Sequence, residues 1–259
     1  MTTIGRGLPS PKTHATIAGM DEPTIITGPE RSVSSRIPWP ILAASACAAL
    51  LLLILWLGHE LVEGDGASLD RAIMLAMRVP GQSDTPIGPS WLPSAMRDVT
   101  ALGSATVLTF VVAATAIFLA LKQRMRSVAL VLTATILGSL VVTVIKALVS
   151  RARPDLIDRL MVEVSHSFPS GHAANSAIVY LTLATLLFPV MPDRRMRGFV
   201  LGVALLLTGA IGISRVYIGV HWPSDVVAGW VFGGSWAMLW WWIELRLLAA
   251  NAAQDERES

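Results

Sequence analysis

The sequence predicts an all-α fold, a polytopic membrane protein built as a bundle of six transmembrane helices. Of its 259 residues, 53% are hydrophobic and only 15% are charged, whereas a soluble domain carries roughly 25% charged residues. Nine tryptophans against two tyrosines suit a chain with two water–lipid interfaces. The third observation is that basic residues gather in alternate connections between apolar stretches.

Six apolar stretches are the predicted spans, because about 20 apolar residues cross the hydrocarbon core. They cover residues 41–57, 99–121, 128–145, 173–191, 199–213 and 226–245. Residues 68–78 repeat apolar side chains at helical spacing but are too short to span, which predicts a helix lying at the interface. The domain plan is therefore a disordered cytoplasmic tail (1–36), a six-helix membrane domain (37–250) and a cytoplasmic C-terminal tail (251–259).

The basic residues predict the orientation, because Lys and Arg in short loops stay in the cytoplasm. All basic clusters share one side only if there are six crossings with both termini inside. Residues 58–98, 146–172 and 214–225 are then extracytoplasmic, and the Ala-rich, short-looped composition suggests a bacterial plasma (inner) membrane. The clusters are Lys122, Arg124 and Arg126; Arg194, Arg195 and Arg197; and, in the tail, Arg6, Lys12, Arg31 and Arg36.

Several classes of partner and site are disfavoured. A net charge of +2 without a basic stripe argues against nucleic acid. The single cysteine, Cys47, excludes an intramolecular disulfide and a cysteine metal cluster. Too few carboxylates and histidines cluster for a two-metal site, so we expect no metal and no cofactor. The oligomeric state is not specified by the sequence.

Polar residues at helix ends form the first candidate block. Lys146 ends an apolar helix, and Arg151, Arg153 and Pro154 follow within about two turns. A point charge and two forked guanidinium groups suit phosphate oxygens. Taken alone, the same residues are more simply explained as a snorkelling lysine and interfacial arginines.

The second block precedes the fourth predicted span and reads Ser167-Phe-Pro-Ser170-Gly171-His172. A helix N-terminus offers free N–H groups and the positive end of the helix dipole, which together bind phosphate. Gly171 lets the backbone approach an anion closely. A plain helix cap explains Ser170 but not His172.

The third block contains Ser214, Arg215, His221 and Asp225, with Pro223 as a predicted first-turn proline of the last helix. Asp225 can reach back and accept a hydrogen bond from one imidazole N–H, leaving the other nitrogen free to attack. Together the blocks supply cations for the phosphoryl oxygens, a nucleophile and a proton donor, which are the groups that phosphoryl transfer needs.

These blocks resemble the type 2 phosphatidic acid phosphatase family, which shares its site with vanadium haloperoxidases and bacterial acid phosphatases. All three family motifs are present in order and without substitution, over residues 146–225. The stretch 98–104 is a weaker similarity, and residues 1–36 lie outside it. The motifs are Lys146, six residues, Arg153-Pro154; Pro169-Ser170-Gly171-His172; and Ser214-Arg215, five residues, His221, three residues, Asp225.

The resemblance implies a role for each motif residue. His221 would be the nucleophile that becomes phosphohistidine, oriented by Asp225, while His172 would protonate the leaving alkoxide and later activate water. The phosphate would be held by Lys146, Arg153, Ser170, Gly171 and Arg215. Arg151 is read as a loop charge or a second anion contact, and His14, His59 and His166 as bystanders.

The expected activity is metal-independent hydrolysis of a membrane lipid phosphate. Undecaprenyl pyrophosphate, phosphatidic acid and phosphatidylglycerol phosphate all fit, because the motifs bind the phosphate and not the tail. One alternative is a phosphatase or phosphotransferase acting on a soluble phosphate such as a sugar phosphate. A transporter is disfavoured because transporters place charge near the bilayer midplane, and a haloperoxidase because those relatives are soluble.

Overall fold

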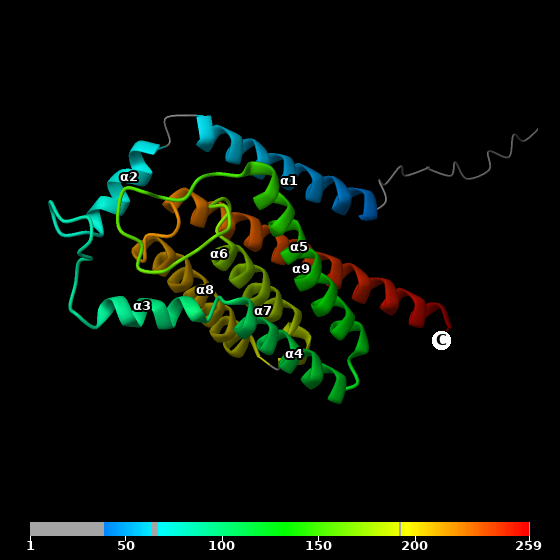
Figure 1. Cartoon of the computed structure of the whole chain (residues 1–259). Coiled ribbons are helices and arrows are strands. Elements are labelled where there is room, and N and C mark those ends of the chain that lie inside the picture. Colours follow the sequence, from blue (N-terminus) through cyan, green and yellow to red (C-terminus); the bar gives the residue numbers. More distant parts are fainter. Residues whose placement is uncertain (1–38, 64–66, 192, 259) are drawn as a thin grey trace, which may run out of the picture. The chain divides into compact units, whose positions relative to one another are not determined.

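The computed structural model describes residues 39–63, 67–191 and 193–258. Every regular element in these ranges is helical (Figure 1). The elements are α1 (Trp39–Glu63), α2 (Ala67–Ala76), α3 (Leu92–Ala101), α4 (Ala105–Leu121), α5 (Met125–Val149), α6 (Gly171–Ser176), the π-helical turn η1 (Ala177–Leu181), α7 (Thr182–Leu186), the 3₁₀ turn η2 (Phe188–Val190), α8 (Arg194–Tyr217) and α9 (Pro223–Glu258).

Several helices are long and apolar enough to cross a membrane. Within the described residues there are four such spans, namely α5, Gly171–Val190, α8 and Pro223–Ala250. The pair α3 and α4, bent by 46°, makes a fifth if it is counted as one span. The apolar part of α1, Pro40–Ile54, is shorter than these. The structure thus supports four or five crossings, and the sixth stays a prediction.

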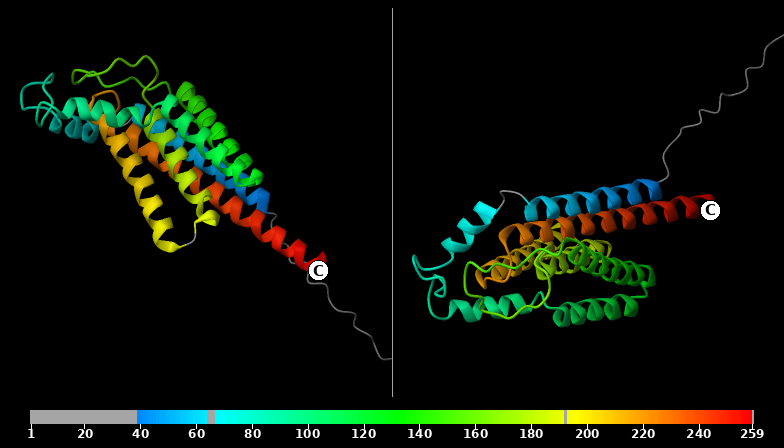
Figure 2. Two further views of the ribbon diagram at one scale, coloured as in Figure 1. Left: turned by 90° about the horizontal axis from the view of Figure 1, so that it is seen from below. Right: turned by 45° about the horizontal axis from the view of Figure 1, so that its top comes forward.

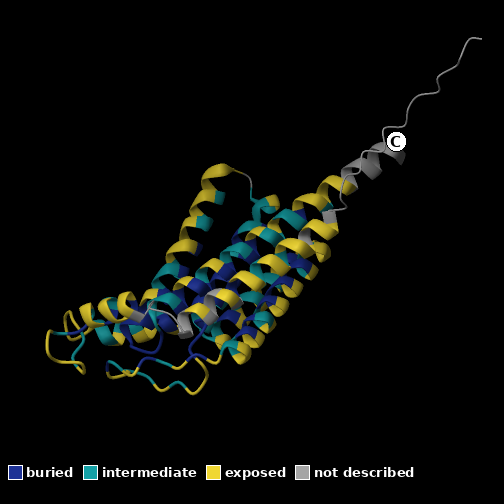
Figure 3. Cartoon of the chain, turned by 90° about the horizontal axis from the view of Figure 1, so that it is seen from above, coloured by how far each residue is buried: buried dark blue, intermediate teal, exposed yellow. Residues whose placement is uncertain are grey.

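The outer faces of the bundle carry the side chains expected against lipid. Phe110 is 72% exposed, Leu140 57% and Leu206 71%, and Figure 3 shows exposed residues along the outer helix faces with buried ones between the helices. Water would disfavour such apolar surface, whereas hydrocarbon solvates it. The chain is therefore built as a multi-pass membrane protein.

Two of the six predicted helices are less regular in the structure than in the sequence pattern. The predicted helix 99–121 is broken at residues 102–104, because Ser104 caps α4 by accepting from the Val107 N–H at 3.3 Å. The predicted helix 173–191 is a succession of α6, η1, α7 and η2. Apolar composition located both segments, although α3 begins at Leu92, before the predicted start at residue 99. It carries no information about these changes of backbone geometry.

The ends of the described chain bear on the predicted tails. The tail 1–36 lies outside the described residues. At the other end α9 continues to Glu258, through most of the predicted tail 251–259. The predicted interfacial helix 68–78 corresponds to α2.

Close contact between α6 and α9 fixes the centre of the bundle. A Cβ added to Gly233 would come within 2.5 Å of the Ala177 Cβ and 2.7 Å of the Ala174 carbonyl oxygen. One turn earlier, a Cβ added to Gly229 would lie 3.0 Å from the Ser170 carbonyl oxygen and 3.0 Å from the Ala174 amide nitrogen. Small residues spaced by four allow helix backbones to touch in this way. The start of α6 is thereby held against the start of α9.

The apolar core continues from this contact into the neighbouring helices. Phe168, Ile178, Phe232 and Trp236 form one buried cluster with Ile145 of α5. Helix α1 runs beside α9 in Figures 1 and 2. Helix α2, the connection from α5 to α6, and the turn from α8 to α9 all lie at one end of the bundle (Figure 2).

Candidate active site

The first block is positioned by the end of α5. The helix stops at Val149, and Ser150 adopts a left-handed conformation at φ 49° while its N–H bonds the Lys146 carbonyl. The Lys146 ammonium donates to the His166 carbonyl at 2.7 Å. Lys146 therefore lies in the last turn of its helix, as predicted, and points toward the second block.

Arg153 is held by carbonyl groups from two directions. Its Nε donates to the Ser165 carbonyl at 2.7 Å, and one terminal nitrogen donates to the Val220 carbonyl at 2.6 Å. The same nitrogen lies 3.4 Å from His221 Nε2. The guanidinium is thus fixed in one plane beside the imidazole of the third block.

The second block begins α6. Ser170 is the N-cap: its Oγ accepts from the Ala173 N–H at 3.5 Å, and its own N–H donates to the Asp225 carbonyl at 3.0 Å. Beside Gly171 the space is open, since a Cβ there would meet one described atom within 4 Å, the Lys146 Cε at 3.9 Å. The predicted cap is confirmed, and the free space lies between the helix start and a lysine.

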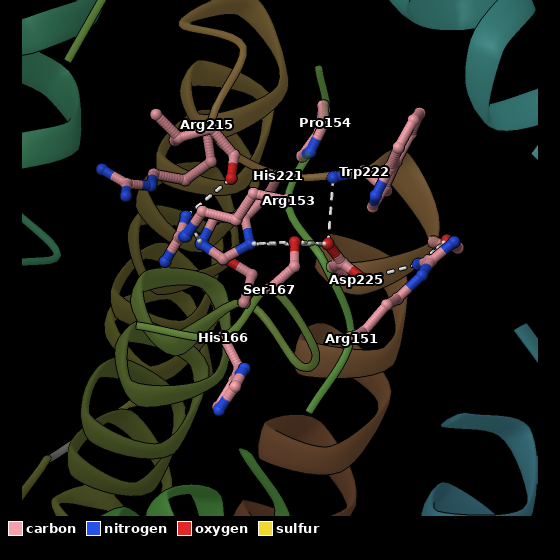
Figure 4. Close-up of polar contacts among 12 residues, drawn as sticks. Arg151, Arg153, Pro154, His166, Ser167, Arg215, His221, Trp222 and Asp225 are labelled. Atoms are coloured by element: carbon pink, nitrogen blue, oxygen red, sulfur yellow. Dashed lines mark hydrogen bonds and ion pairs between the residues drawn. The ribbon is translucent and has the colours of Figure 1, made fainter. Parts of the chain in front are cut away.

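The third block closes on the start of α9, which begins at Pro223 as predicted. His221 is 1% exposed and Asp225 is fully buried. His221 Nδ1 lies 3.5 Å from Asp225 Oδ2. That oxygen also accepts from the Trp222 N–H at 2.9 Å and from the Ser167 hydroxyl (Figure 4).

Ser167 contacts both members of the His221–Asp225 pair, and the sequence interpretation did not single it out. Its Oγ lies 3.4 Å from His221 Nδ1 while it donates to Asp225 Oδ2, so it sits beside the His–Asp contact (Figure 4). Its place at the head of the second block was the available signal. The serine and the aspartate together surround Nδ1 with acceptor oxygens.

The surroundings of His221 define its tautomer. A guanidinium is a donor only, so the Nε2 that faces Arg153 must be the unprotonated nitrogen, and Nδ1 carries the proton. Burial lowers the pKa of His221 to about 4; the hydrogen bond and charge of Asp225 raise it, and the charges of Arg215 and Arg153 lower it. At neutral pH the imidazole is uncharged, with the Nε2 lone pair available.

Arg215 is a fully buried cation near the end of α8. One of its terminal nitrogens donates to the Thr100 hydroxyl at 3.2 Å, and the other donates to the Glu163 carboxylate. Glu163 also lies 3.7 Å from Arg153. Two of the predicted phosphate-binding arginines thus converge on one anionic group.

Glu163 itself was absent from the predicted site, because it stands in a connection outside the three motifs. Burial would raise the pKa of its carboxyl, but the hydrogen bond and charge of Arg215 outweigh this and hold the pKa below its usual range. The side chain is 23% exposed. It is a partly accessible carboxylate where the resemblance expects a phosphate.

His172 lies in the first turn of α6, against the break between α3 and α4. A Cβ on Gly103 would lie 3.4 Å from the His172 ring. The imidazole interacts electrostatically with Arg215, Glu163, His221 and Lys146. The structure therefore brings all three motifs to one place and adds the stretch 98–104 to its edge.

Arg151 differs from both of its predicted readings. It is 7% exposed, and it donates to Asp225 Oδ1 at 2.6 Å and to Asp70 Oδ2 at 3.0 Å. Its guanidinium is occupied by two carboxylates of the chain, so it is a buried bridging cation and neither an exposed loop charge nor a free contact for a substrate anion. Its partner Asp70 comes from α2, where the sequence shows only an amphipathic pattern.

The predicted bystanders are placed only in part. The His166 side chain is exposed, but its carbonyl accepts from Lys146. His14 and the side chain of His59 lie outside the described part of the structure. Across the described ranges, no group of three or more His, Cys, Asp or Glu side chains could hold a metal ion; independence from metal stays a prediction.

Comparison with known proteins bears on this arrangement. A sequence model of the PAP2 superfamily matches residues 127–248. Phosphatidylglycerophosphatase B of Bacillus subtilis is 35% identical over 149 residues, covering 55% of this chain and 70% of that protein. Lipid A 1-phosphatase of Rhizobium etli is 34% identical over 116 residues, which is 41% of this chain and 46% of that enzyme.

A solved structure shares the arrangement of helices. The transmembrane PAP2 type phosphatidylglycerolphosphate phosphatase from Bacillus subtilis superposes with a TM-score of 0.67 at 28% identity, covering 78% of this chain and 96% of that one. The matched family region contains all three motif blocks, and the overlap with the Bacillus enzyme is extensive. The chain belongs to the PAP2 superfamily and is a multi-pass membrane phosphatase.

Proposed function

We propose that this protein hydrolyses the phosphate ester or pyrophosphate of a membrane lipid, without a metal, through a phosphohistidine on His221. The observation that carries the proposal is the Glu163 carboxylate, which interacts with both Arg215 and Arg153. Arg153 in turn lies 3.4 Å from His221 Nε2. A phosphate that displaced this carboxylate would meet the same two guanidinium groups, which suit it in charge and geometry.

The first half of the reaction follows from the tautomer. His221 Nε2 attacks phosphorus while the bond to the leaving oxygen breaks, giving phosphohistidine and an alkoxide. His172 donates a proton to that alkoxide. Asp225 and Ser167 stabilise the positive charge that develops on the ring at Nδ1.

The second half restores the enzyme. His172, now neutral, removes a proton from a water molecule, which attacks phosphorus and breaks the P–N bond. The bond electrons return to Nε2, and inorganic phosphate leaves. Lys146, Arg153, Arg215 and the N–H groups at the start of α6 neutralise the phosphoryl oxygens in both steps.

The direction of the helices supports an extracytoplasmic site. Helix α5 runs from the basic turn at Lys122 and Arg124 to Lys146, and α8 runs from Arg194 to Arg215. The basic turns and the site therefore lie at opposite ends of these helices. With the basic turns in the cytoplasm, six crossings, including α1 and the bent pair α3–α4, place both termini there and the site outside.

A groove beside the site favours a lipid substrate over a soluble one. A cavity of about 590 Å³ lies between α4, α5 and the start of α6, lined by Thr109, Ile136, Thr143 and Asn175 among others. Thr143 is one turn before Lys146 on α5, and Asn175 is one turn after His172 on α6. A tail in this groove would leave its phosphate near the motifs.

The primary test is phosphate release by purified full-length protein from phosphatidylglycerol phosphate, phosphatidic acid, undecaprenyl pyrophosphate, a lipid A phosphate and glucose 6-phosphate. Each assay is run with EDTA and beside His221→Ala. We expect EDTA-resistant release from one or more lipids, reduced by at least about a thousandfold in the variant. Loss of activity in EDTA, or an active variant, would refute the mechanism.

The substrate class is tested by filling the groove. Ser139→Trp places an indole in the cavity between α4 and α5, whereas Ser235→Trp places one in the separate groove between α1 and α9. We expect only Ser139→Trp to lower turnover of the lipid, with turnover of a short-chain phosphate unchanged in both. Equal effects on the two substrates would favour a soluble phosphate as the natural one.

A further inference from the structure

A buried carboxylate from outside the three motifs reaches the start of α9. Asp70 stands in the first turn of α2 and is 3% exposed. Its Oδ1 accepts from the Ser224 N–H at 2.9 Å, and its Oδ2 accepts from the Ser224 hydroxyl. The first N–H groups of a helix lack partners within the helix, so Asp70 supplies to α9 a cap from another element.

Asp70 is linked to the His–Asp pair through a single cation. Arg151 donates to Asp70 Oδ2 at 3.0 Å with one terminal nitrogen. The other terminal nitrogen donates to Asp225 Oδ1 at 2.6 Å (Figure 4). The second nitrogen also donates to the Ser224 hydroxyl at 2.8 Å. The guanidinium lies over the Trp222 ring, 5.6 Å from its centroid. The bridge is thus closed to water on several sides.

We propose that Asp70 is a positioning residue for the phosphatase reaction, acting through Arg151 on Asp225. The proposal rests on the role of His221 as nucleophile. Arg151 fixes the Oδ1 oxygen of Asp225, so that Oδ2 is turned toward His221 Nδ1. Asp70 in turn fixes Arg151.

The second effect of Asp70 is on charge. Arg151 by itself would draw electron density toward Oδ1 and weaken the interaction of Oδ2 with the imidazolium that forms in the transition state. A second carboxylate on the same guanidinium offsets that positive charge. In a buried site such charges interact strongly because water does not screen them. Asp70 therefore keeps Asp225 a strong acceptor.

The two effects predict different outcomes for single and double variants. Asp70→Asn leaves the charge of Arg151 unopposed, and we expect kcat to fall about tenfold or more with KM within about twofold, because the phosphate contacts are untouched. Arg151→Gln removes the orienting cation together with its charge and should cost less. Asp70→Asn/Arg151→Gln should then be at least about threefold more active than Asp70→Asn alone, a non-additive result.

The assay uses full-length protein in detergent with the best lipid of the panel, and thermal unfolding is followed for every variant. Asp84→Asn is the matched control, because this exposed carboxylate bonds only to Thr85 among the described residues. If Asp70→Asn does not fold, Arg151→Lys replaces it. Lys keeps the charge but cannot bridge two carboxylates as a fork, so kcat should again fall at constant KM.

The outcomes separate this proposal from the one it rests on. An inactive His221→Ala beside an Asp70→Asn of wild-type kcat overturns the positioning role alone. A double variant weaker than Asp70→Asn does the same, since a purely structural contact predicts additive losses. An active His221→Ala overturns the nucleophile, whatever the Asp70 variants show.

Discussion

The two ring nitrogens of His221 face surroundings of opposite character. On the Nδ1 side, Asp225, Arg151 and Asp70 have side chains no more than 8% exposed, and each charge has a buried partner of opposite sign. On the Nε2 side, Arg153 and Arg215 share a carboxylate that is 23% exposed. The side chain of Glu163 is thus the most accessible in either ion-pair set.

This difference in burial indicates that the ion pairs near Nδ1 are permanent, whereas the Glu163 carboxylate near Nε2 can be replaced by another anion. A buried pair is costly to break, because the partner left behind keeps its charge without compensation. A partly exposed carboxylate can move into water and be replaced by another anion at little cost. The Nδ1 side of His221 therefore contacts a buried ion-pair network, while the Nε2 side faces a carboxylate that another anion could replace, as the proposed reaction requires.

Arg215→Lys, on the Nε2 side of His221, gives the largest expected effect. A lysine keeps the charge but loses the fork that bonds Thr100 and Glu163. We expect kcat/KM to fall by about 100-fold or more, the loss seen when one preorganised donor is removed from a developing negative charge. Steady-state kinetics on the best lipid measures it.

The matched control for Arg215→Lys is Arg78→Lys. Arg78 is a second buried arginine that donates to backbone carbonyls, one of them in the spacer of the third motif, and to none of the motif side chains proposed to bind phosphate. These carbonyls belong to Met77, Ser83, Asp158 and Tyr217. Its replacement should lower thermal stability and leave the kcat/KM of the folded protein unchanged. Similar kinetic losses in both variants would mean that Arg215 serves the fold and not the phosphate.

Gly171→Ala is expected to separate activity from stability. The added methyl group enters the space beside Lys146, where a phosphate oxygen would approach the start of α6. We predict about a tenfold lower kcat/KM, equivalent to about 1.4 kcal/mol. Stability should hold or rise, because Ala restricts the unfolded chain.

Gly202→Ala in α8 provides the comparison, since no described atom lies within 4 Å of its added Cβ. It should show the same stability change without the kinetic loss. If Gly171→Ala also kept wild-type kinetics, the anion would not approach this helix start.

Glu163→Gln should strengthen the binding of an anion at the site, and the effect should be smaller than those of the two preceding variants. Without the carboxylate, Arg215 and Arg153 lack their internal competitor, and vanadate, an analogue of the transition state, should inhibit about fivefold more tightly, on the scale of ~1 kcal/mol for a partly exposed ion pair. Asp158→Asn, an exposed carboxylate in the same connection, is the control. Weaker inhibition in Glu163→Gln would assign Glu163 to phosphate binding itself.

The smallest expected effect concerns the pH at which the His221 ring becomes protonated. Because burial and the two arginines lower its pKa to about 4, the ring should remain neutral at a pH of about 6, below the ordinary histidine value of about 6.5. Asp225→Asn removes a charge that raises the pKa, so the variant should titrate at still lower pH. Nitrogen NMR of labelled histidine tests both statements, and a protonated ring at pH about 6 contradicts them.

The sequence singled out the motif residues on both sides of His221, Asp225 among them, but neither Asp70 nor Glu163. Lys146, Arg153, Arg215 and His221 stand at set spacings within motifs, next to helix ends that apolar length reveals. Asp70 reaches the site only because α2 folds across the start of α9, a tertiary contact that no local pattern encodes.

Arg151 was misread for the same reason, because its meaning depends on the two carboxylates that meet it. The break at Gly103 and Ser104 was also missed, since an apolar run looks the same on either side of it. In each case the missing information concerned neighbours distant in sequence, or a hydrogen bond from a single side chain.

The contact at Gly229 and Gly233 has a consequence for how the protein tolerates its surroundings. Because α6 and α9 meet through backbone atoms there, the spacing between the helix that carries His172 and the helix that carries Asp225 does not depend on flexible side chains. Bilayers differ in thickness, and helices respond by tilting. The outer helices can follow such changes while α6 and α9, whose first turns carry His172 and Asp225, keep a constant separation.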